Sequence, residues 1–141
     1  MLRDKRAAFS LHTMSIDILL TRDPLVALKP MTRPDAGAVV DFWGVVREME
    51  GAARITGIEY EAHEEMAAHQ LKRLGEDAHA RFGLMEMTLH HRIGFVSAAE
   101  ASLFVRVQAG HRAEALDACR WVIDELKRVV PIWKKPVPAD K

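Results

Sequence analysis

The sequence has a single cysteine, Cys119, among its 141 residues, which excludes an intramolecular disulfide framework. One free thiol is typical of a reducing compartment, so we expect the protein in the cytoplasm. Net charge is also lacking, because twenty basic residues balance twenty acidic ones. No apolar run is long enough to span a bilayer. Because the chain carries no net charge that would attract anions over its whole surface, any anion must be recognised by a local cluster of cations.

The composition is that of an ordinary globular protein, with 49% hydrophobic and 28% charged residues. Neither an internal repeat, nor a linker, nor a low-complexity tract divides the chain. We therefore expect one domain over residues 15–141. Residues 1–14 are charged and lack a core pattern, so we expect them to be a flexible N-terminal extension.

The hydrophobic pattern alternates between period two and period 3.6, which predicts a mixed α+β domain. Five strands are expected at 15–20, 37–46, 54–61, 84–93 and 101–108. One or two helical turns are expected at 24–28, loops at 48–53 and 94–99, and a full helix over 63–82. A last helix follows residue 110, ends before Pro131 and leads into an extended exit. Its apolar stripe consists of Leu116, Cys119, Val122, Ile123, Leu126, Val129 and Val130.

Both ends of this last helix carry cations. His111 and Arg112 stand at its start, where free N–H groups and the positive end of the dipole favour an anion. Lys127 stands near its end, and Lys134 and Lys135 follow on the exit segment. Each cluster is either a solvent-facing group of charges or part of a site for a phosphorylated or carboxylated ligand.

A continuous helix limits how the two clusters can cooperate. His111 and Lys127 are sixteen positions apart, which corresponds to roughly 24 Å along the axis. One small ligand cannot touch both within one chain. Either the clusters are two sites, or a two-fold dimer brings one chain's His111 and Arg112 to the other chain's lysines.

The seven histidines are poorly spaced for metal ligation. His90 and His91 are adjacent on an expected strand, so they point to opposite faces, and we expect surface or edge positions. Cys119 lies on the apolar stripe and is expected to be a buried structural thiol. We therefore expect neither a metal nor a cofactor.

Six short motifs occur in one order between residues 16 and 135. They are Phe42-Trp43-Gly44-Val45-Val46-Arg47, Glu59-Tyr60-Glu61-Ala62 with Met66-Ala67, His91-Arg92-Ile93-Gly94, Gly110-His111-Arg112, Leu126-Lys127 and Pro131-Ile132-Trp133-Lys134-Lys135. Any one of these motifs is a weak signal, but six of them in a fixed order and spacing are specific. In order and spacing they resemble the large, catalytic subunit of molybdopterin synthase.

This resemblance implies an α/β hammerhead-type fold with an antiparallel sheet, and a homodimer of large subunits. A small ubiquitin-like sulfur-carrier subunit would dock on each copy, giving a heterotetramer. Its C-terminal Gly-Gly thiocarboxylate would enter a pocket of the large subunit. There, two sulfur atoms would pass in turn to cyclic pyranopterin monophosphate and form the dithiolene of molybdopterin.

The same resemblance implies residue roles. Lys127 and Lys134 would be catalytic, and Arg47 would line the same pocket. His111 and Arg112 would bind the substrate from the neighbouring subunit, and Lys135 would also bind substrate. Because sulfur arrives on the partner, no reactive cysteine is required.

Two departures from the family pattern leave an alternative open. His63 and Glu65 replace an aromatic residue and a proline, which we interpret as tolerated surface changes. Pro136 follows the lysine pair where the family has an acidic residue and a longer tail, so we expect a more open pocket or a partner that takes the tail's role. The alternative function is a catalytically weak paralogue that binds the small subunit. A nucleic-acid-binding domain is disfavoured by the balanced charge and the few aromatic residues.

Overall fold

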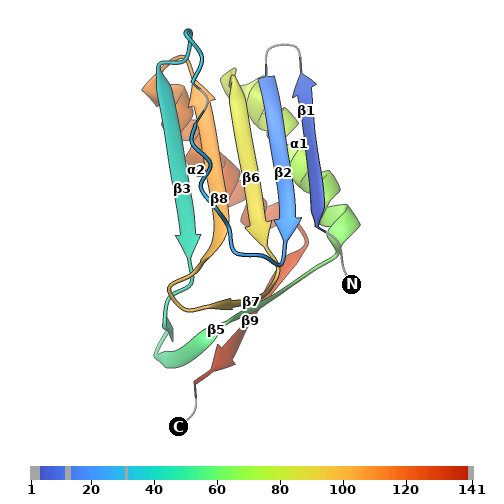
Figure 1. Cartoon of the computed structure of the whole chain (residues 1–141), viewed down its shortest axis with the longest axis vertical. Coiled ribbons are helices and arrows are strands. Elements are labelled where there is room, and N and C mark those ends of the chain that lie inside the picture. Colours follow the sequence, from blue (N-terminus) through green and yellow to red (C-terminus); the bar gives the residue numbers. More distant parts are fainter. Residues whose placement is uncertain (1–3, 12–13, 31, 140–141) are drawn as a thin grey trace.

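A five-stranded sheet forms the larger part of the molecule, in a computed structural model that describes residues 4–11, 14–30 and 32–139 (Figure 1). Its strand order is β1 (Lys5–Leu11), β2 (Met14–Thr21), β6 (Glu86–Arg92), β8 (Ala101–Ala109) and β3 (Ala38–Val45). The β2–β6 pair is parallel and the other pairs are antiparallel. The expected α+β class is confirmed, with a mixed rather than a purely antiparallel large sheet.

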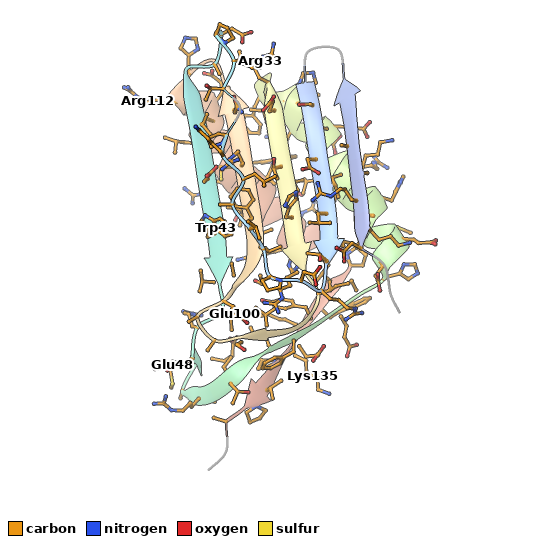
Figure 2. The ribbon with its side chains drawn as sticks, in the orientation of Figure 1. Arg33, Trp43, Glu48, Glu100, Arg112 and Lys135 are labelled. Atoms are coloured by element: carbon orange, nitrogen blue, oxygen red, sulfur yellow. The ribbon has the colours of Figure 1, made fainter. Side chains whose placement is uncertain are left out.

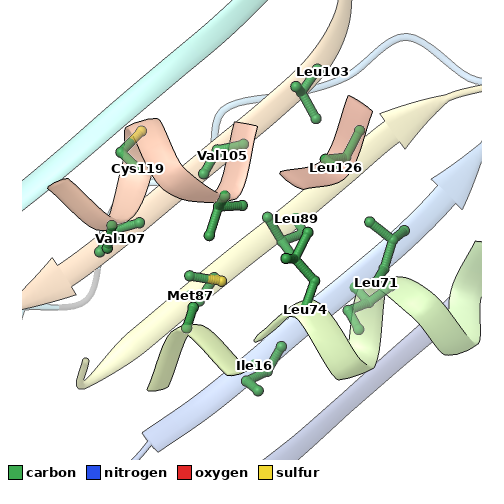
Figure 3. Close-up of a cluster of buried hydrophobic side chains, with 14 of the residues drawn as sticks. Ile16, Leu71, Leu74, Met87, Leu89, Leu103, Val105, Val107, Cys119 and Leu126 are labelled. Atoms are coloured by element: carbon green, nitrogen blue, oxygen red, sulfur yellow. The ribbon is translucent and has the colours of Figure 1, made fainter. Parts of the chain in front are cut away.

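Two helices, α1 (Glu64–Phe82) and α2 (Arg112–Val129), cover one face of this sheet (Figure 1). Alternation in β2 turns Ile16, Ile18 and Leu20 toward the helices, and each of these side chains is buried. Figure 3 shows the resulting core between helices and sheet, which includes Leu71, Leu74, Met87, Leu89, Val105, Cys119 and Leu126. This packing holds α2 in a fixed position on β8.

A smaller antiparallel sheet extends from one end of the large sheet (Figure 1). Strand β5 (Ala53–Ala62) pairs with β4 (Met49–Glu50), β7 (Gly94–Ser97) and β9 (Ile132–Pro138). Strand β9 begins three residues after α2 ends, so the small sheet lies next to the C-terminal end of that helix. The expected extended exit is therefore an edge strand.

Local sequence explains where both helices begin and end. His63 caps α1, because its Nδ1 accepts the N–H of Met66, and Gly83 ends it with a left-handed φ of 65°. The exposed positions of His63 and Glu65 agree with their interpretation as surface changes. Helix α2 ends before Pro131, as expected. Leu116 is an exception to the expected apolar stripe, since it is 54% exposed.

The expectation of a flexible N-terminal extension differs from the structure. Lys5–Leu11 forms strand β1, antiparallel to β2, and Arg6 makes an ion pair of 3.2 Å with Asp17. The physical reason is that β1 pairs backbone groups that would otherwise stay open along the outer edge of β2. Residues 1–3 and 12–13 lie outside the described residues.

The expected helical turns at 24–28 are wrong, because this segment is irregular and crosses the face of the large sheet that the helices leave open (Figure 1). Arg106 on β8 donates to the carbonyl oxygen of Leu28 at 2.6 Å, while its other nitrogens hold both carboxylate oxygens of Asp41. This tertiary hydrogen bond fixes the segment against the sheet, and so short a helix has little stability of its own. The expected loops at 48–53 and 94–99 contain the short strands β4 and β7.

Candidate active site

A pocket of about 430 Å³ lies where the two sheets and the end of α2 meet. Every element at this junction contributes to its wall. The lining side chains come from β3 and the residues after it, β4, β5, β6, β8, the end of α2, and β9: Phe42, Gly44, Val45, Val46, Arg47, Glu50, Ile58, Tyr60, His91, Ser102, Leu103, Leu126, Lys127, Val130, Ile132 and Lys134. Residues as distant in the chain as Phe42 and Lys134 therefore share one cavity.

Three cations converge on this pocket. Arg47 follows β3, Lys127 is in the last turn of α2, and Lys134 is on β9. The backbone at Lys127 is held in place by the neighbouring Leu126, which is buried in the core. The structure thus brings together the two lysines to which the family resemblance assigns catalysis and the arginine expected beside them.

One carboxylate partly offsets this positive charge. The Oε1 atom of Glu50, on β4, lies 3.5 Å from the Nζ atom of Lys134. Both side chains are partly solvated, so the pair contributes little to stability. Among the described residues, Arg47 and Lys127 form no ion pair, and the lining therefore keeps an excess of positive charge.

Lys135 is not among the residues that line the pocket. It pairs in register with Glu59, whereas Lys134 pairs with Tyr60, which does line the pocket. Successive side chains of a strand point to opposite faces, so Lys135 lies on the far side of β9 from Lys134.

His111 and Arg112 lie at the opposite end of the molecule from the lysines. Figure 2 shows Arg112 at one end of the large sheet and Lys135 in the small sheet at the other. Helix α2 runs unbroken between them, over about 27 Å for its 18 residues. His111 is exposed, and its Nδ1 lies 3.3 Å from a carboxylate oxygen of Glu114. Within one chain, these two cations do not line the pocket.

An uncharged polar wall faces the cations. Tyr60 donates its hydroxyl hydrogen to Ser102 Oγ at 3.1 Å, and Ser102 in turn donates to the carbonyl of Gly44 at 3.5 Å. His91 stands beside this chain, with its ring edge-to-face against Tyr60 at 5.2 Å between centroids. Burial lowers the pKa of His91 to about 4, with a small opposing effect of its bond to the Arg92 carbonyl. The imidazole is therefore neutral at physiological pH.

Sequence reasoning missed this histidine. His90 and His91 point to opposite faces, as expected, but they are 4% and 6% exposed rather than on the surface. His90 bonds Asp17 at 3.2 Å on the other side of the sheet, while His91 lines the pocket. The only signal in the sequence was the motif that begins at His91. Strand alternation alone does not tell which face of a strand is covered.

The thiol takes no part in the pocket. Cys119 is buried in the core between α2 and the large sheet, as the apolar stripe predicted. Burial raises its pKa, and the negative charge of Asp41 adds to the effect. Within residues 4–11, 14–30 and 32–139, no group of three or more His, Cys, Asp or Glu side chains is placed to hold a metal ion. Neither helix in that part of the chain is long and apolar enough to cross a membrane.

Comparison with known proteins adds a family to this geometry. Residues 20–129 match the model of the family described as MoaE protein. The molybdopterin synthase catalytic subunit of Thermoplasma volcanium is 40% identical over 115 residues, which cover 82% of this chain and 84% of the relative. The corresponding subunit of Oryza sativa subsp. indica is 45% identical over 105 residues, covering 74% of this chain but 54% of that longer relative.

Solved structures show the same fold. Molybdopterin synthase from Staphylococcus aureus superposes with a TM-score of 0.73 at 32% identity, over 78% of this chain and 80% of that one. A complex of subunits 1 and 2 of molybdopterin-converting factor from Helicobacter pylori contains a chain with a TM-score of 0.61 at 23% identity, over 76% and 74% of the two chains. At that identity the second likeness shows the fold alone.

Proposed function

We propose a function on the premise that the chain belongs to the MoaE family of molybdopterin synthase catalytic subunits, which are sulfurtransferases. In this function, the chain passes two sulfur atoms to cyclic pyranopterin monophosphate. The sulfur donor would be the C-terminal thiocarboxylate of a small ubiquitin-like subunit. The product would be the dithiolene of molybdopterin. The reaction is expected in the cytoplasm.

The observation that carries this proposal is the convergence of Arg47, Lys127 and Lys134 on one pocket. Opening a cyclic phosphate and passing through acyl-bound intermediates both build negative charge. Cations that are already in place stabilise such charge without reorganisation at the moment of reaction. The buried Cys119 is not needed, because the sulfur arrives on the partner.

Each cation has a distinct position and therefore a distinct proposed role. We assign catalysis to Lys127 and Lys134, which approach the pocket from α2 and β9. Either lysine can move the protons that sulfur addition requires. Arg47 presents a planar fork of donors that suits a phosphate or a carboxylate. Lys135, on the other face of β9, would contribute to substrate binding only through its longer-range charge.

His111 and Arg112 enter the proposal through a second copy of the chain. Their own pocket lies at the far end of a continuous α2, so they would serve the pocket of a neighbour. An exposed apolar surface supports such a homodimer. Strand β3 is an edge of the large sheet, and its Phe42 and Val45, which border the pocket, are 36% and 52% exposed. Exposed apolar side chains along the unpaired edge of a sheet offer a surface against which a second chain can pack.

The small subunit would fill the remaining opening. Its extended Gly-Gly tail carries no bulky side chain, which suits a narrow cavity between two sheets. The negative thiocarboxylate would compete with Glu50 for Lys134, since these two side chains lie 3.5 Å apart in the free chain. With both subunits bound to each copy, the assembly would be a heterotetramer.

Mixing two inactive variants tests the shared pocket. Lys127→Ala removes a cation from a chain's own pocket, and Arg112→Ala removes one from its neighbour's pocket. In a mixed dimer, the pocket of the Arg112→Ala chain has its own Lys127 and its neighbour's Arg112, so it is intact. The pocket of the Lys127→Ala chain lacks both cations. After subunit exchange at equal amounts, we expect about a quarter of the wild-type rate, because half of the dimers are mixed and each has one working pocket.

A matched control uses two variants of the same pocket. Lys127→Ala mixed with Lys134→Ala leaves every pocket one lysine short, so no activity should return. Recovery in this control, or none in the first mixture, would contradict the dimer proposal. The assay supplies thiocarboxylated small subunit and cyclic pyranopterin monophosphate and measures molybdopterin. Wild-type protein that binds the small subunit but forms no product would instead support the weak-paralogue alternative.

A further inference from the structure

His91 is the one buried titratable side chain of the pocket that the roles above leave unused. It lies on β6, at the back of the cavity, while the cations Lys127 and Lys134 come from α2 and β9. Its ring is held on two sides, by an edge contact with Tyr60 and by a hydrogen bond to the backbone. A side chain so fixed presents its free atom in one direction only.

The backbone bond determines the tautomer. Nδ1 of His91 lies 2.7 Å from the carbonyl oxygen of Arg92. A carbonyl only accepts hydrogen bonds, so Nδ1 carries the hydrogen and Nε2 of the neutral ring carries a lone pair. Nε2 has no partner in the described part of the chain, and it is not sealed from solvent. Its lone pair therefore opens to the pocket that the ring lines.

His91 Nε2 is an acceptor of this cavity that no other described side chain engages. Lysine and arginine side chains are donors only, so Arg47, Lys127 and Lys134 cannot receive an N–H group. The hydroxyls of Tyr60 and Ser102 are already linked to each other, and one carboxylate oxygen of Glu50 lies 3.5 Å from Lys134. A reduced pterin, by contrast, carries several ring N–H groups and an exocyclic amino group. Each of these groups loses free energy if it is buried without an acceptor.

We propose that Nε2 of His91 accepts a hydrogen bond from an N–H group of the substrate's heterocycle and so orients the substrate against the two lysines. His91 is thus a specificity-determining residue that touches the substrate. This inference rests on the proposed function, because it takes the pterin as the ligand. A neutral imidazole that resists protonation suits this task better than general base catalysis near neutral pH.

Two substitutions of His91 distinguish the role of Nδ1 from the role of Nε2. In His91→Asn the amide nitrogen replaces Nδ1 and keeps the bond to the Arg92 carbonyl, but the acceptor at Nε2 is lost. In His91→Gln the amide oxygen reaches the place of Nε2. We expect His91→Asn to raise the KM for cyclic pyranopterin monophosphate about tenfold or more, with a smaller change in kcat, and His91→Gln to restore KM to within about threefold. Equal KM values for wild type and His91→Asn would overturn the proposal.

The adjacent histidine is the matched control for damage to the fold. His90→Asn changes an equally buried ring on the other side of the sheet, where it bonds Asp17. Its KM should stay within about twofold of wild type. A rise as large as that of His91→Asn would show that KM responds to loss of packing, and the assignment would fail.

A measurement on wild-type protein avoids variants altogether. In nitrogen-15 spectra of histidine-labelled protein, the His91 signal, assigned by its absence in His91→Gln, should show hydrogen on Nδ1 and none on Nε2. Saturating cyclic pyranopterin monophosphate should shift Nε2 and leave Nδ1 nearly unchanged. An unshifted Nε2 in a protein that turns the substrate over would refute this inference but not the proposed function. Absence of both binding and turnover in the wild type would refute the proposed function itself.

Discussion

Acid should destabilise the fold through His91, in a pH window that the structure defines. The folded chain holds this imidazole neutral, with its pKa lowered from 6.5 to about 4 by burial. The unfolded chain binds a proton there near pH 6.5. Between these two values the unfolded state binds more protons, so the free energy of unfolding falls as the pH falls.

The size of this effect follows from the shift. One pKa unit corresponds to about 1.4 kcal/mol, so the interval from 6.5 to about 4 corresponds to a loss of about 3 kcal/mol. The free energy of unfolding is not reduced by this group above pH 6.5, and it falls as the pH falls toward 4. Asp17 acts in a lower window, because the hydrogen bond from His90 lowers its pKa below the ordinary value of 3.8. The two effects are therefore separable on the pH axis.

Urea unfolding of wild type and His91→Asn, followed by circular dichroism, measures this loss. Every other titrating group is common to both proteins, so the difference between their free energies of unfolding isolates the histidine. We expect the wild type to lose about 3 kcal/mol more than the variant between about pH 7 and about pH 4. Parallel pH dependences in the two proteins would refute the reasoning, since His91 would then not be held neutral by the fold.

Three further predictions concern the pocket and the small sheet beside it. Lys127→Ala should reduce molybdopterin formation about 100-fold or more while the small subunit still binds, as measured by turnover and by co-sedimentation. Lys134→Ala should reduce turnover at least about tenfold, whereas Lys135→Ala, on the other face of β9, should change it less than about threefold. Gly57→Ala should destabilise the protein by about 2 kcal/mol in thermal unfolding, because its Cβ would clash with the Val96 carbonyl oxygen.

Specific outcomes would contradict these three predictions. Near-wild-type turnover of Lys127→Ala would remove its catalytic role. Equal losses of turnover in Lys134→Ala and Lys135→Ala would mean that activity does not depend on which face of β9 carries the lysine. Gly110→Ala is the steric control for Gly57→Ala, because the nearest atom to its Cβ is Met85 Cε at 3.9 Å. A similar loss of stability in both glycine variants would point to backbone entropy rather than to the clash.

Much of the local structure was predictable because it depends on neighbours in the sequence. The expected helix over 63–82 corresponds to α1 at Glu64–Phe82, and Pro131 ends the helical run of α2 at the expected place. Period-two alternation located β2, β3, β5, β6 and β8 to within two residues. One failure is β1, which pairs with the neighbouring strand β2 although its own residues show no core pattern. The other is the irregular segment at 24–28, where Arg106, far along the chain, supplies a hydrogen bond to Leu28.

The sequence by itself determined which side chains share a strand face or a helix stripe, and that a continuous α2 keeps His111 away from Lys127. These properties follow from the fixed repeats of the backbone. Only the tertiary structure decided which faces are covered. It placed β9 against β5 so that Lys134 turns toward Lys127 and Lys135 turns away, and it buried His91 in the same cavity. Strand pairing and packing depend on contacts between distant segments, and local periodicity does not record which segments will meet.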